Sequence, residues 1–373
     1  MKKIAVCISI LLVVFFNTGV SAVEFSGDAK SLILIEQNTG DVLYELNADA
    51  AYPPASVTKI MTALLVVEQI DNGVISLDDM VTTSEKAASM GGSQIYLEVG
   101  EQMSVNDLLK SVMVASANDA ATALAEFVSG SEEAFVARMN ERAKELGMNN
   151  TNFENTNGLD DTAQNHVTSA RDIAIMSKEL LKHPIIFNYT TIWMDTVRNG
   201  EFTLTNTNRL IKFFNGANGL KTGSTSKAGF CISASAKRDN LQLIAVVMGA
   251  STRDVRNKTA GEMLEYGFAN FDYGGFENDN VCNIPIKGGK DTEFCAEYQG
   301  YGAVVKKGEK LEKNVVIFDD ISAPIAQGDV VGKVTYFCAD KTLYECDVIS
   351  CEDVQKIGFL DAFVSILKNA LIL

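Results

Sequence analysis

The chain has 373 residues, of which 47% are hydrophobic and 21% are charged. This length and composition predict two folded domains and exclude a disordered or fibrous protein. The formal charge of −16 argues against a nucleic-acid-binding protein, because such proteins present clustered basic surfaces.

The N-terminal segment has the pattern of a secretory signal peptide. Lys2 and Lys3 precede an apolar run that ends at Phe16, and small residues follow at positions 20–22. The run is shorter than the roughly 20 apolar residues that span a bilayer, which favours cleavage after residue 22 over a membrane anchor. Cleavage removes two lysines and no acidic residue, so the formal charge changes from −16 to −18.

Residues 23–273 are predicted to form an α+β domain. A strand hairpin is expected at 31–35 and 42–46, followed by helices at 56–70, 106–128 (with a break at 116–119), 132–146 and 169–181. Strands at 201–204, 219–222, 229–236 and 241–248 are expected to form an antiparallel meander, and a helix at 257–268 closes the domain.

The remainder of the chain changes in character. Residues 271–280 are rich in Gly, Asp and Asn and are predicted to be a linker, and 274–353 are predicted to be a small all-β domain. Residues 354–373 have the spacing of an amphipathic helix, either packed on its own domain or lying in a membrane interface; the wide apolar face favours the membrane. The six cysteines after the signal segment are too sparse for a disulfide scaffold, and both pairing and free thiols remain open.

The first candidate for chemistry is the spacing Ser56-x-x-Lys59 at the start of a helix. A serine hydroxyl needs an adjacent base to act as a nucleophile, and residues i and i+3 share a helix face. A buried lysine near another cation becomes neutral more easily and can then accept the serine proton. Alone, the spacing also fits an N-cap serine with a solvent-facing lysine.

Two further short motifs carry polar groups suited to the same reaction. Ser116-x-Asn118 lies at the break between two helices, where Ser116 is a candidate proton relay and Asn118 a candidate partner of Lys59 and of the substrate; capping is the alternative. Lys221-Thr222-Gly223 lies on a predicted strand, where Lys221 and Thr222 suit a carboxylate and the glycine permits close backbone approach.

S-x-x-K, S-x-N and K-T-G in this order are the signature of penicillin-binding and related serine enzymes. The chain resembles the low-molecular-mass D-alanyl-D-alanine carboxypeptidases over nearly its whole length, from signal segment to terminal helix. Further matching stretches are Pro54–Lys59, Gly158–Asp160, Thr168–Asp172, Asn206–Asn208 and Gly219–Gly223. Two positions depart from the family pattern. Asn218 stands where family members often have an aspartate, and Ser224 stands where they commonly have a histidine or an aromatic residue.

The resemblance implies a β-lactamase/transpeptidase-like catalytic domain that removes the terminal D-alanine from peptidoglycan stems ending in D-Ala-D-Ala. It implies acylation of Ser56, also by β-lactam antibiotics, with Lys59 as base and Ser116, linked to Lys59, as proton donor to the leaving group. Backbone N–H groups of Ser56 and Ser224 would stabilise the oxyanion. Lys221, Thr222 and Arg256 would hold the terminal carboxylate, with Arg253 as the rival of Arg256. The expected location is the outer face of the cytoplasmic membrane or the cell wall space, with peripheral contact through the terminal helix.

Other functions fit less well. A Ser-His-Asp hydrolase is disfavoured because there are only two histidines, and His166 is expected in a loop before a helix. No metal or cofactor motif occurs, so neither group is expected. A class A β-lactamase is disfavoured by the extra β domain and by Gly158, where the family's glutamate motif requires asparagine four residues after Glu154. A catalytically weak scaffold or β-lactam sensor remains the alternative from another functional class.

Overall fold

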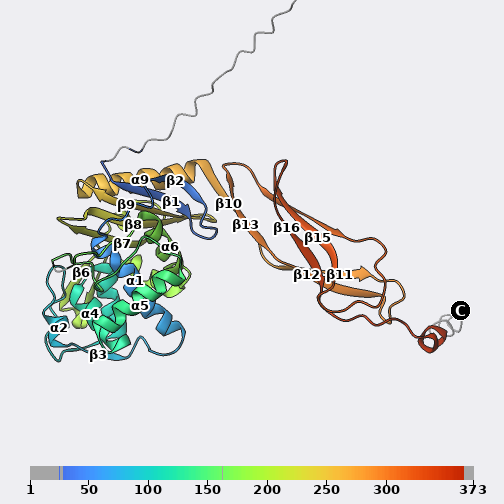
Figure 1. The fold of residues 1–373 in the computed structure, drawn as a ribbon, viewed down its shortest axis with the longest axis horizontal. Helices are drawn as coiled ribbons and strands as arrows, with labels where there is room; N and C mark the ends of the chain where they lie inside the picture. The colour runs from blue at the N-terminus through green and yellow to red at the C-terminus, as the bar shows by residue number, and fades with distance from the viewer. Residues whose placement is uncertain (1–24, 26–27, 162, 365–373) are drawn as a thin grey trace, which may run out of the picture.

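The computed structural model describes residues 25, 28–161 and 163–364. These residues form an N-terminal body of helices around a sheet and an elongated C-terminal body of strands (Figure 1). Strands β10 (Phe271–Phe276) and β13 (Tyr301–Lys306) lead from one body to the other (Figure 1). The predicted signal peptide, residues 1–22, lies outside the described residues.

A five-stranded antiparallel sheet in the order β2-β1-β9-β8-β7 forms the centre of the N-terminal body. Its strands are β1 (Ser31–Glu36), β2 (Val42–Leu46), β7 (Ala217–Thr225), β8 (Gly229–Arg238) and β9 (Leu241–Ala250). The predicted hairpin of β1 and β2 and the meander of β7, β8 and β9 are confirmed.

The strand predicted at 201–204 does not join this sheet. It corresponds to β6 (Phe202–Thr205), which pairs with β5 (Met194–Val197) across the turn Arg198–Gly200. Strands adjacent in sequence pair with little loop-closure cost, and this local partner was not recognised from the sequence.

Helices cover both faces of the sheet. Helix α9 (Arg253–Asn270) packs on the face to which Leu32 and Leu34 of β1 point, and Ile33 and Ile35 point to the helices on the other face. Those helices are α1 (Lys59–Asp71), α2 (Glu85–Ala88), α3 (Val105–Val114), α4 (Asn118–Ser129), α5 (Glu132–Glu145), α6 (Ala170–Leu180) and α7 (Phe187–Thr190). The short helix α8 (Leu210–Phe213) lies on the α9 face, where Leu210 is buried in the same cluster as Leu32 and Leu34. A small ribbon of β3 (Met80–Thr82) and β4 (Gln102–Ser104) lies beside them.

Helix α1 runs through the interior of the helical layer. Every residue from Lys59 to Val67 is buried, as its nearly continuous apolar pattern predicted. Its start differs from the prediction, because Ala55–Thr58 form a 3-10 turn (η1) and Ser56 therefore precedes the α-helix. The predicted break between α3 and α4 is confirmed, and Ser169 caps α6 as expected by accepting a hydrogen bond from the backbone of Asp172.

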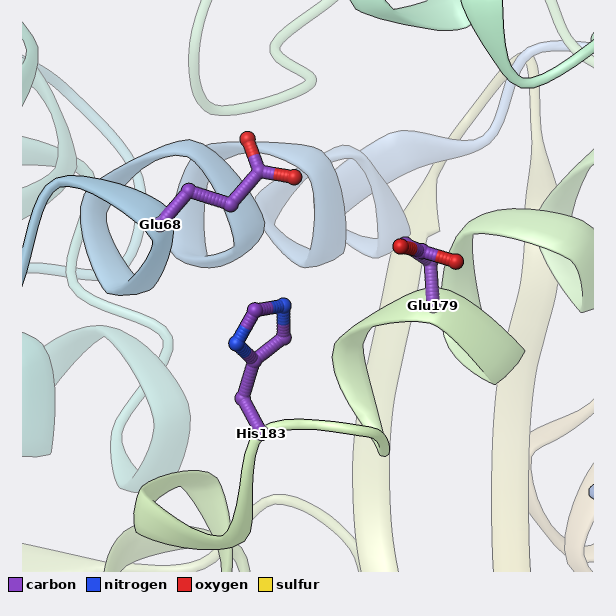
Figure 2. A group of neighbouring side chains, drawn as sticks. All are labelled: Glu68, Glu179 and His183. Atoms are coloured by element: carbon purple, nitrogen blue, oxygen red, sulfur yellow. The ribbon is translucent and has the colours of Figure 1, made fainter. Parts of the chain in front are cut away.

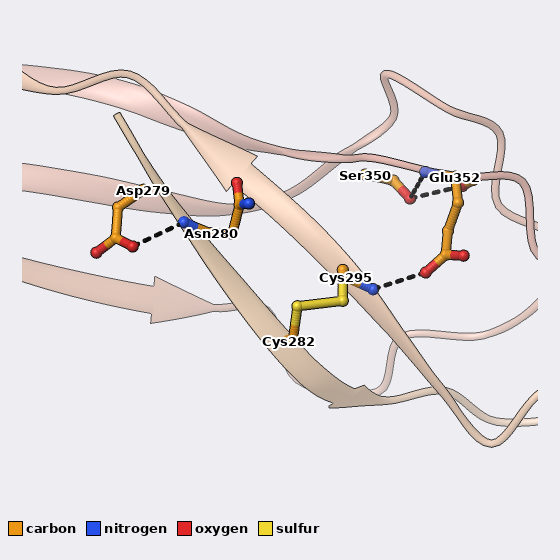
Figure 3. Close-up of a disulfide and its surroundings, with 6 residues drawn as sticks. All are labelled: Asp279, Asn280, Cys282, Cys295, Ser350 and Glu352. Atoms are coloured by element: carbon orange, nitrogen blue, oxygen red, sulfur yellow. Dashed lines mark hydrogen bonds between the residues drawn. A yellow bond between two sulfur atoms is a disulfide. The ribbon is translucent and has the colours of Figure 1, made fainter. Parts of the chain in front are cut away.

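The C-terminal body is an antiparallel sheet in the order β11-β12-β16-β15-β14. Its strands are β11 (Asp279–Pro285), β12 (Glu293–Tyr298), β14 (Leu311–Ile317), β15 (Val330–Cys338) and β16 (Lys341–Ser350). A disulfide between Cys282 and Cys295 joins β11 to β12 (Figure 3). The other cysteines of the described residues are free: Cys231, Cys338, Cys346 and Cys351.

The predicted linker at 271–280 joins the two bodies, but most of it is paired strand and not loop. The boundary predicted between residues 273 and 274 falls inside β10, which pairs with β13 along its length. Glycines of both strands serve close packing rather than flexibility. A Cβ on Gly274 of β10 would lie 2.6 Å from Cβ of Leu311, and one on Gly302 of β13 would lie 2.0 Å from the hydroxyl of Tyr273.

The predicted terminal helix begins later than residue 354. Val354 is buried in the core of the C-terminal body and bridges to Ile325, and Lys356 bridges to Gly289. Helical residues start at Phe359, and residues 365–373 lie outside the described part. No helix among the described residues is long and apolar enough to cross a membrane.

Candidate active site

The predicted nucleophile lies in the turn that precedes α1. Nζ of Lys59, the first residue of α1, lies 3.0 Å from Oγ of Ser56. Ala55 has a φ of 50°, a left-handed conformation that alanine rarely adopts. Gly158 packs so tightly on this turn that a Cβ there would lie 1.9 Å from the carbonyl oxygen of Ala55. The surrounding structure therefore holds Ser56 in a constrained turn.

Lys59 is fully buried, and three oxygen atoms surround its amine. Nζ donates to Oδ1 of Asn118 at 2.6 Å and to the backbone oxygen of Asn157 at 2.7 Å, in addition to its contact with Ser56. Burial, and then the charge of Lys221, lower the pKa of Lys59 well below the usual lysine value. A neutral amine has two hydrogens and one lone pair. The two carbonyl oxygens take both hydrogens, which leaves the lone pair for the hydroxyl of Ser56.

Ser116 and Asn118 lie where α3 ends and α4 begins. Ser116 has a φ of 65° and is 4% exposed, and its Oγ accepts a hydrogen bond from Nζ of Lys221 at 2.8 Å. The expected link from Ser116 to Lys59 is therefore replaced by a link to Lys221, which β7 brings across the cleft. Asn118 faces Lys59 as expected, and its Nδ2 donates to the backbone oxygen of Gly91 at 2.6 Å, which fixes the orientation of the amide.

Strand β7 carries the third motif along the edge of the sheet. Lys221 is fully buried, and its Nζ also donates to the backbone oxygen of Thr222 at 2.8 Å. Burial, and then the charge of Arg256, lower the pKa of Lys221 to about 7. A Cβ on Gly223 would lie 2.7 Å from the backbone nitrogen of Ser56, so this glycine allows β7 to approach Ala55–Thr58. This turn carries the predicted nucleophile and is called the nucleophile turn below. Ser224 follows as an exposed residue.

These segments enclose a pocket of about 300 Å³. Its lining residues are Ser56, Ser93, Ser116, Trp193, Asn206, Thr207, Arg209, Thr222, Gly223, Ser224, Arg253 and Arg256. Both candidate arginines line it, but Arg256 is 3% exposed whereas Arg253 is exposed at the rim. Burial, and then the charge of Arg253, lower the pKa of Arg256 to about 10. Ser93, Trp193 and Arg209 were not predicted, because they come from loops without a motif.

Comparisons with known proteins identify the family of the chain. Residues 18–252 match the peptidase S11 family model, described as D-alanyl-D-alanine carboxypeptidase. The chain belongs to this D-alanyl-D-alanine carboxypeptidase family. Residues 277–356 match the model of the C-terminal domain of penicillin-binding protein 5. The enzyme is thus a serine-type D-Ala-D-Ala carboxypeptidase, and the scaffold alternative is not favoured.

Individual relatives cover most of the carboxypeptidase chain. D-alanyl-D-alanine carboxypeptidase DacF of Bacillus subtilis is 45% identical over 346 residues, which cover 90% of this chain and 88% of the relative. The structure of penicillin-binding protein 5 from Haemophilus influenzae is 32% identical, with a TM-score of 0.75, and covers 91% of this chain and 100% of its own. Penicillin-binding protein D2 of Listeria monocytogenes, solved in an ampicillin-bound form, is 33% identical, with a TM-score of 0.60. The match covers 66% of this chain and 99% of the Listeria chain.

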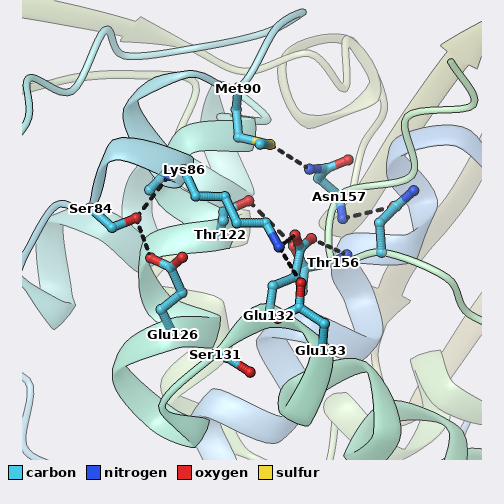
Figure 4. A network of polar contacts seen from close by, with 12 residues as sticks. Ser84, Lys86, Met90, Thr122, Glu126, Ser131, Glu132, Glu133, Thr156 and Asn157 are labelled. Carbon is cyan, nitrogen blue, oxygen red and sulfur yellow. Dashed lines mark hydrogen bonds and ion pairs between the residues drawn. The ribbon is translucent and has the colours of Figure 1, made fainter. Parts of the chain in front are cut away.

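A polar network supports the loop that supplies Asn157 to the carboxypeptidase site (Figure 4). Oε1 of the buried Glu132 accepts hydrogen bonds from the backbone nitrogen and Oγ1 of Thr156 at 3.1 and 2.9 Å, and Oε2 pairs with Lys86 at 2.9 Å. The backbone oxygen of Thr156 accepts from Oγ1 of Thr62 on α1 at 2.6 Å. The residue before Asn157 is thereby tied to α5 and α1. Sequence reasoning missed Asn157 because its backbone oxygen, which every residue has, makes the contact.

One group of described side chains brings metal-ligating atoms within 4.8 Å of one another: Glu68, Glu179 and His183 (Figure 2). Arg142 already pairs with Glu68 at 2.9 Å and with Glu179 at 3.4 Å, and Nδ1 of His183 is hydrogen-bonded to Asp71. Glu68 and Asp71 lie in the last turns of α1, whereas Lys59 is its first residue. The group is therefore charge-paired within the protein and separate from the candidate active site.

Proposed function

We propose that Ser56 is the residue acylated when this enzyme removes the terminal D-alanine from peptidoglycan pentapeptide stems. The observation that carries the proposal is the 3.0 Å contact between Oγ of Ser56 and the buried amine of Lys59, whose two hydrogens are already engaged. A base prepared in this way is what a serine nucleophile requires.

In the acylation step, Lys59 takes the proton of Ser56 as Oγ attacks the carbonyl carbon of the penultimate D-alanine. The negative charge that develops on the carbonyl oxygen is stabilised by the backbone N–H groups of Ser56 and Ser224. The close packing of Gly223 against the nitrogen of Ser56 supports this assignment, because it brings the two donors to the same side of the cleft.

Collapse of the tetrahedral intermediate breaks the amide bond and releases D-alanine. Ser116 gives its proton to the departing amine and receives one from Lys221, to which it is hydrogen-bonded at 2.8 Å. With a pKa of about 7, Lys221 is an ammonium group that can lose a proton near neutral pH. The proton held by Lys59 restores that of Lys221 before the acyl-enzyme is hydrolysed, which leaves Lys59 neutral for the second step.

The substrate carboxylate binds to Lys221, Thr222 and Arg256 on the other side of Ser116. These residues supply two cations and a hydroxyl, the donors that suit a carboxylate. The burial of Arg256 favours it over the exposed Arg253. Water then attacks the acyl-enzyme with Lys59 as base, and the proton returned to Ser56 Oγ completes the hydrolysis.

The same chemistry makes β-lactams acylating inhibitors, since their strained amide meets the same nucleophile. The ampicillin-bound form of the Listeria relative supports this proposal. We further propose that the enzyme acts outside the cytoplasmic membrane and contacts its surface through the C-terminal helix. Phe359, Leu360 and Phe363 support the contact, because they are exposed apolar residues on the described part of that helix.

The test is D-alanine release from a peptide ending in D-Ala-D-Ala by the chain without residues 1–22, beside a Ser56→Ala control. Release by the unsubstituted enzyme alone is expected. Equal release by the Ser56→Ala variant would refute the assignment of the nucleophile. Stoichiometric labelling by a fluorescent penicillin without release would refute efficient hydrolysis and favour a sensor.

A further inference from the structure

His166 occupies a buried position beside the nucleophile turn that the mechanism above does not use. Its side chain is 5% exposed and lies in the segment before α6, as the sequence predicted. The imidazole packs edge-on against Phe153, with ring centroids 5.7 Å apart. Both ring nitrogens nevertheless have polar partners, which packing alone does not require.

The hydrogen bonds of His166 determine which nitrogen carries its proton. Nδ1 lies 3.0 Å from the backbone nitrogen of Glu154, an N–H that can only donate, so Nδ1 is unprotonated. Nε2 therefore carries the proton and donates it to Oγ1 of Thr58 at 2.8 Å. The hydroxyl of Thr58 in turn donates to the backbone oxygen of Ala55 at 2.8 Å. Each group in this chain of three hydrogen bonds donates to the next. The chain starts at Glu154 and ends on Ala55, the residue before the predicted nucleophile.

The same histidine closes the loop that holds the catalytic lysine. Its bond to Glu154 joins the two ends of the loop 154–166, and the carboxylate of Glu154 adds bonds from the backbone nitrogens of Gln164 and Asn165 at 2.8 and 3.1 Å. Within this loop, the backbone oxygen of Asn157 accepts from Lys59.

We propose that His166 is a positioning residue for acylation. Its hydrogen bonds hold the loop 154–166 against the nucleophile turn and so fix Ser56 and Lys59 relative to each other. It acts through Thr58 and Glu154 and does not touch the substrate. The inference rests on the proposed role of Ser56.

The electrostatic surroundings keep the required tautomer at neutral pH. Burial lowers the pKa of His166 to about 4, whereas the carboxylates of Glu154 and Asp160 oppose this shift. Above that pH the ring is neutral and Nδ1 can accept from Glu154. Below that pH, a protonated Nδ1 would face the N–H of Glu154, and the hydrogen bond between them would be lost.

The kinetic test compares His166→Leu and His166→Gln, with His183→Ala as control, because these are the only two histidines of the chain. The reaction is acylation by a fluorescent penicillin: its amplitude counts folded sites and its rate reports positioning. His166→Leu is expected to lower the rate roughly 10- to 100-fold at unchanged amplitude, because small misplacements of reacting groups are that costly. His166→Gln should recover much of the rate, because its amide can donate to Thr58, and His183→Ala should leave the rate unchanged.

A double-mutant cycle separates positioning from general damage. Thr58→Val removes the hydroxyl that receives the proton of His166, so combining it with His166→Leu should slow acylation little further than the more damaging single change. The proposal would be overturned if the two single losses of acylation rate multiplied in the double variant. It would also be overturned if His166→Leu acylated at the unsubstituted rate, or if His166→Gln recovered none of the rate. Labelling of Ser56→Ala would instead overturn the proposed function, so the two failures are distinguishable.

Nitrogen-15 spectra of the imidazoles, on protein without a histidine tag, test the directions of the two hydrogen bonds of His166. The signals that survive in His183→Ala belong to His166. They should report the tautomer protonated at Nε2, unchanged from pH 8 to pH 5. A proton on Nδ1, or titration near the ordinary histidine pKa of about 6.5, would overturn the proposal.

Discussion

Replacement of Gly223 by alanine should separate the edge of the sheet from the nucleophile turn. The added Cβ would lie 2.7 Å from the nitrogen of Ser56, 2.8 Å from the oxygen of Pro54 and 2.9 Å from the nitrogen of Val57. All three atoms belong to the backbone, so no side chain can rotate away. Ordinary contact begins at 3.4 Å, which requires a displacement of about 0.7 Å.

Two magnitudes follow from this displacement. Overpacking of this kind costs about 1–3 kcal/mol of the free energy of unfolding. Since a misplacement of about 1 Å near reacting groups can lower a rate about 100-fold, acylation of Gly223→Ala should slow roughly 30- to 100-fold. Urea denaturation measures the first effect, and stopped-flow labelling with a fluorescent penicillin measures the second.

Gly261→Ala is the matched control. Its added Cβ would lie 3.7 Å from the ring of Phe214, an ordinary contact, within helix α9. Alanine in a helix interior is favoured over glycine by about 0.5–1 kcal/mol, so this variant should be as stable as the unsubstituted enzyme or more so, with an unchanged acylation rate. Folded Gly223→Ala that acylates at the unsubstituted rate would refute the argument that Gly223 sets the distance between β7 and Ser56.

Three further predictions concern the lysines and the disulfide. Asn118→Ala removes one of the two oxygens that engage the amine of Lys59 and should slow acylation roughly 100-fold; stopped-flow labelling within threefold of the unsubstituted rate would contradict this. kcat/KM should rise with pH as Lys59 loses its proton and fall above about pH 7 as Lys221 loses the charge that binds the carboxylate; a steady rise from pH 5 to pH 9 would argue against this role. Cys282→Ser, which opens the bridge to Cys295 across 13 residues, should lower the stability of the C-terminal body by about 3 kcal/mol in urea and leave D-alanine release unchanged.

The sequence predicted the candidate site residues whose proposed roles depend on their side chains. Ser56, Lys59 and Lys221 stand in short motifs whose spacing reflects a helix start and a strand, and those local contexts are set by nearby residues. It did not predict that Ser116 bonds to Lys221, because the pairing depends on how β7 approaches the α3–α4 break across the fold. Asn157 was not predicted because its contact with Lys59 is made by its backbone oxygen, which every residue type has.

The fold shows the same division between local and distant causes. The hairpin of β1 and β2 and the limits of α5 and α6 follow from turn and capping residues, and both were predicted closely. The glycine-rich segment at 271–280 was misread, because the side chains that its glycines accommodate, such as Leu311, are distant in sequence. Composition alone cannot distinguish a glycine that confers freedom from one that allows close contact.

The cations of the cleft form a series in which each one depresses the pKa of the next. Arg253 acts on Arg256, Arg256 on Lys221, and Lys221 on Lys59, with burial as the larger cause at each step. In the proposed mechanism, the substrate carboxylate binds between Arg256 and Lys221 and offsets part of that repulsion. The basicity of Lys59 therefore increases when the substrate is bound and Ser56 must lose its proton. A peptide without a free terminal carboxylate should lose rate in the acylation step as well as affinity, because it fails to raise the basicity of the catalytic lysine.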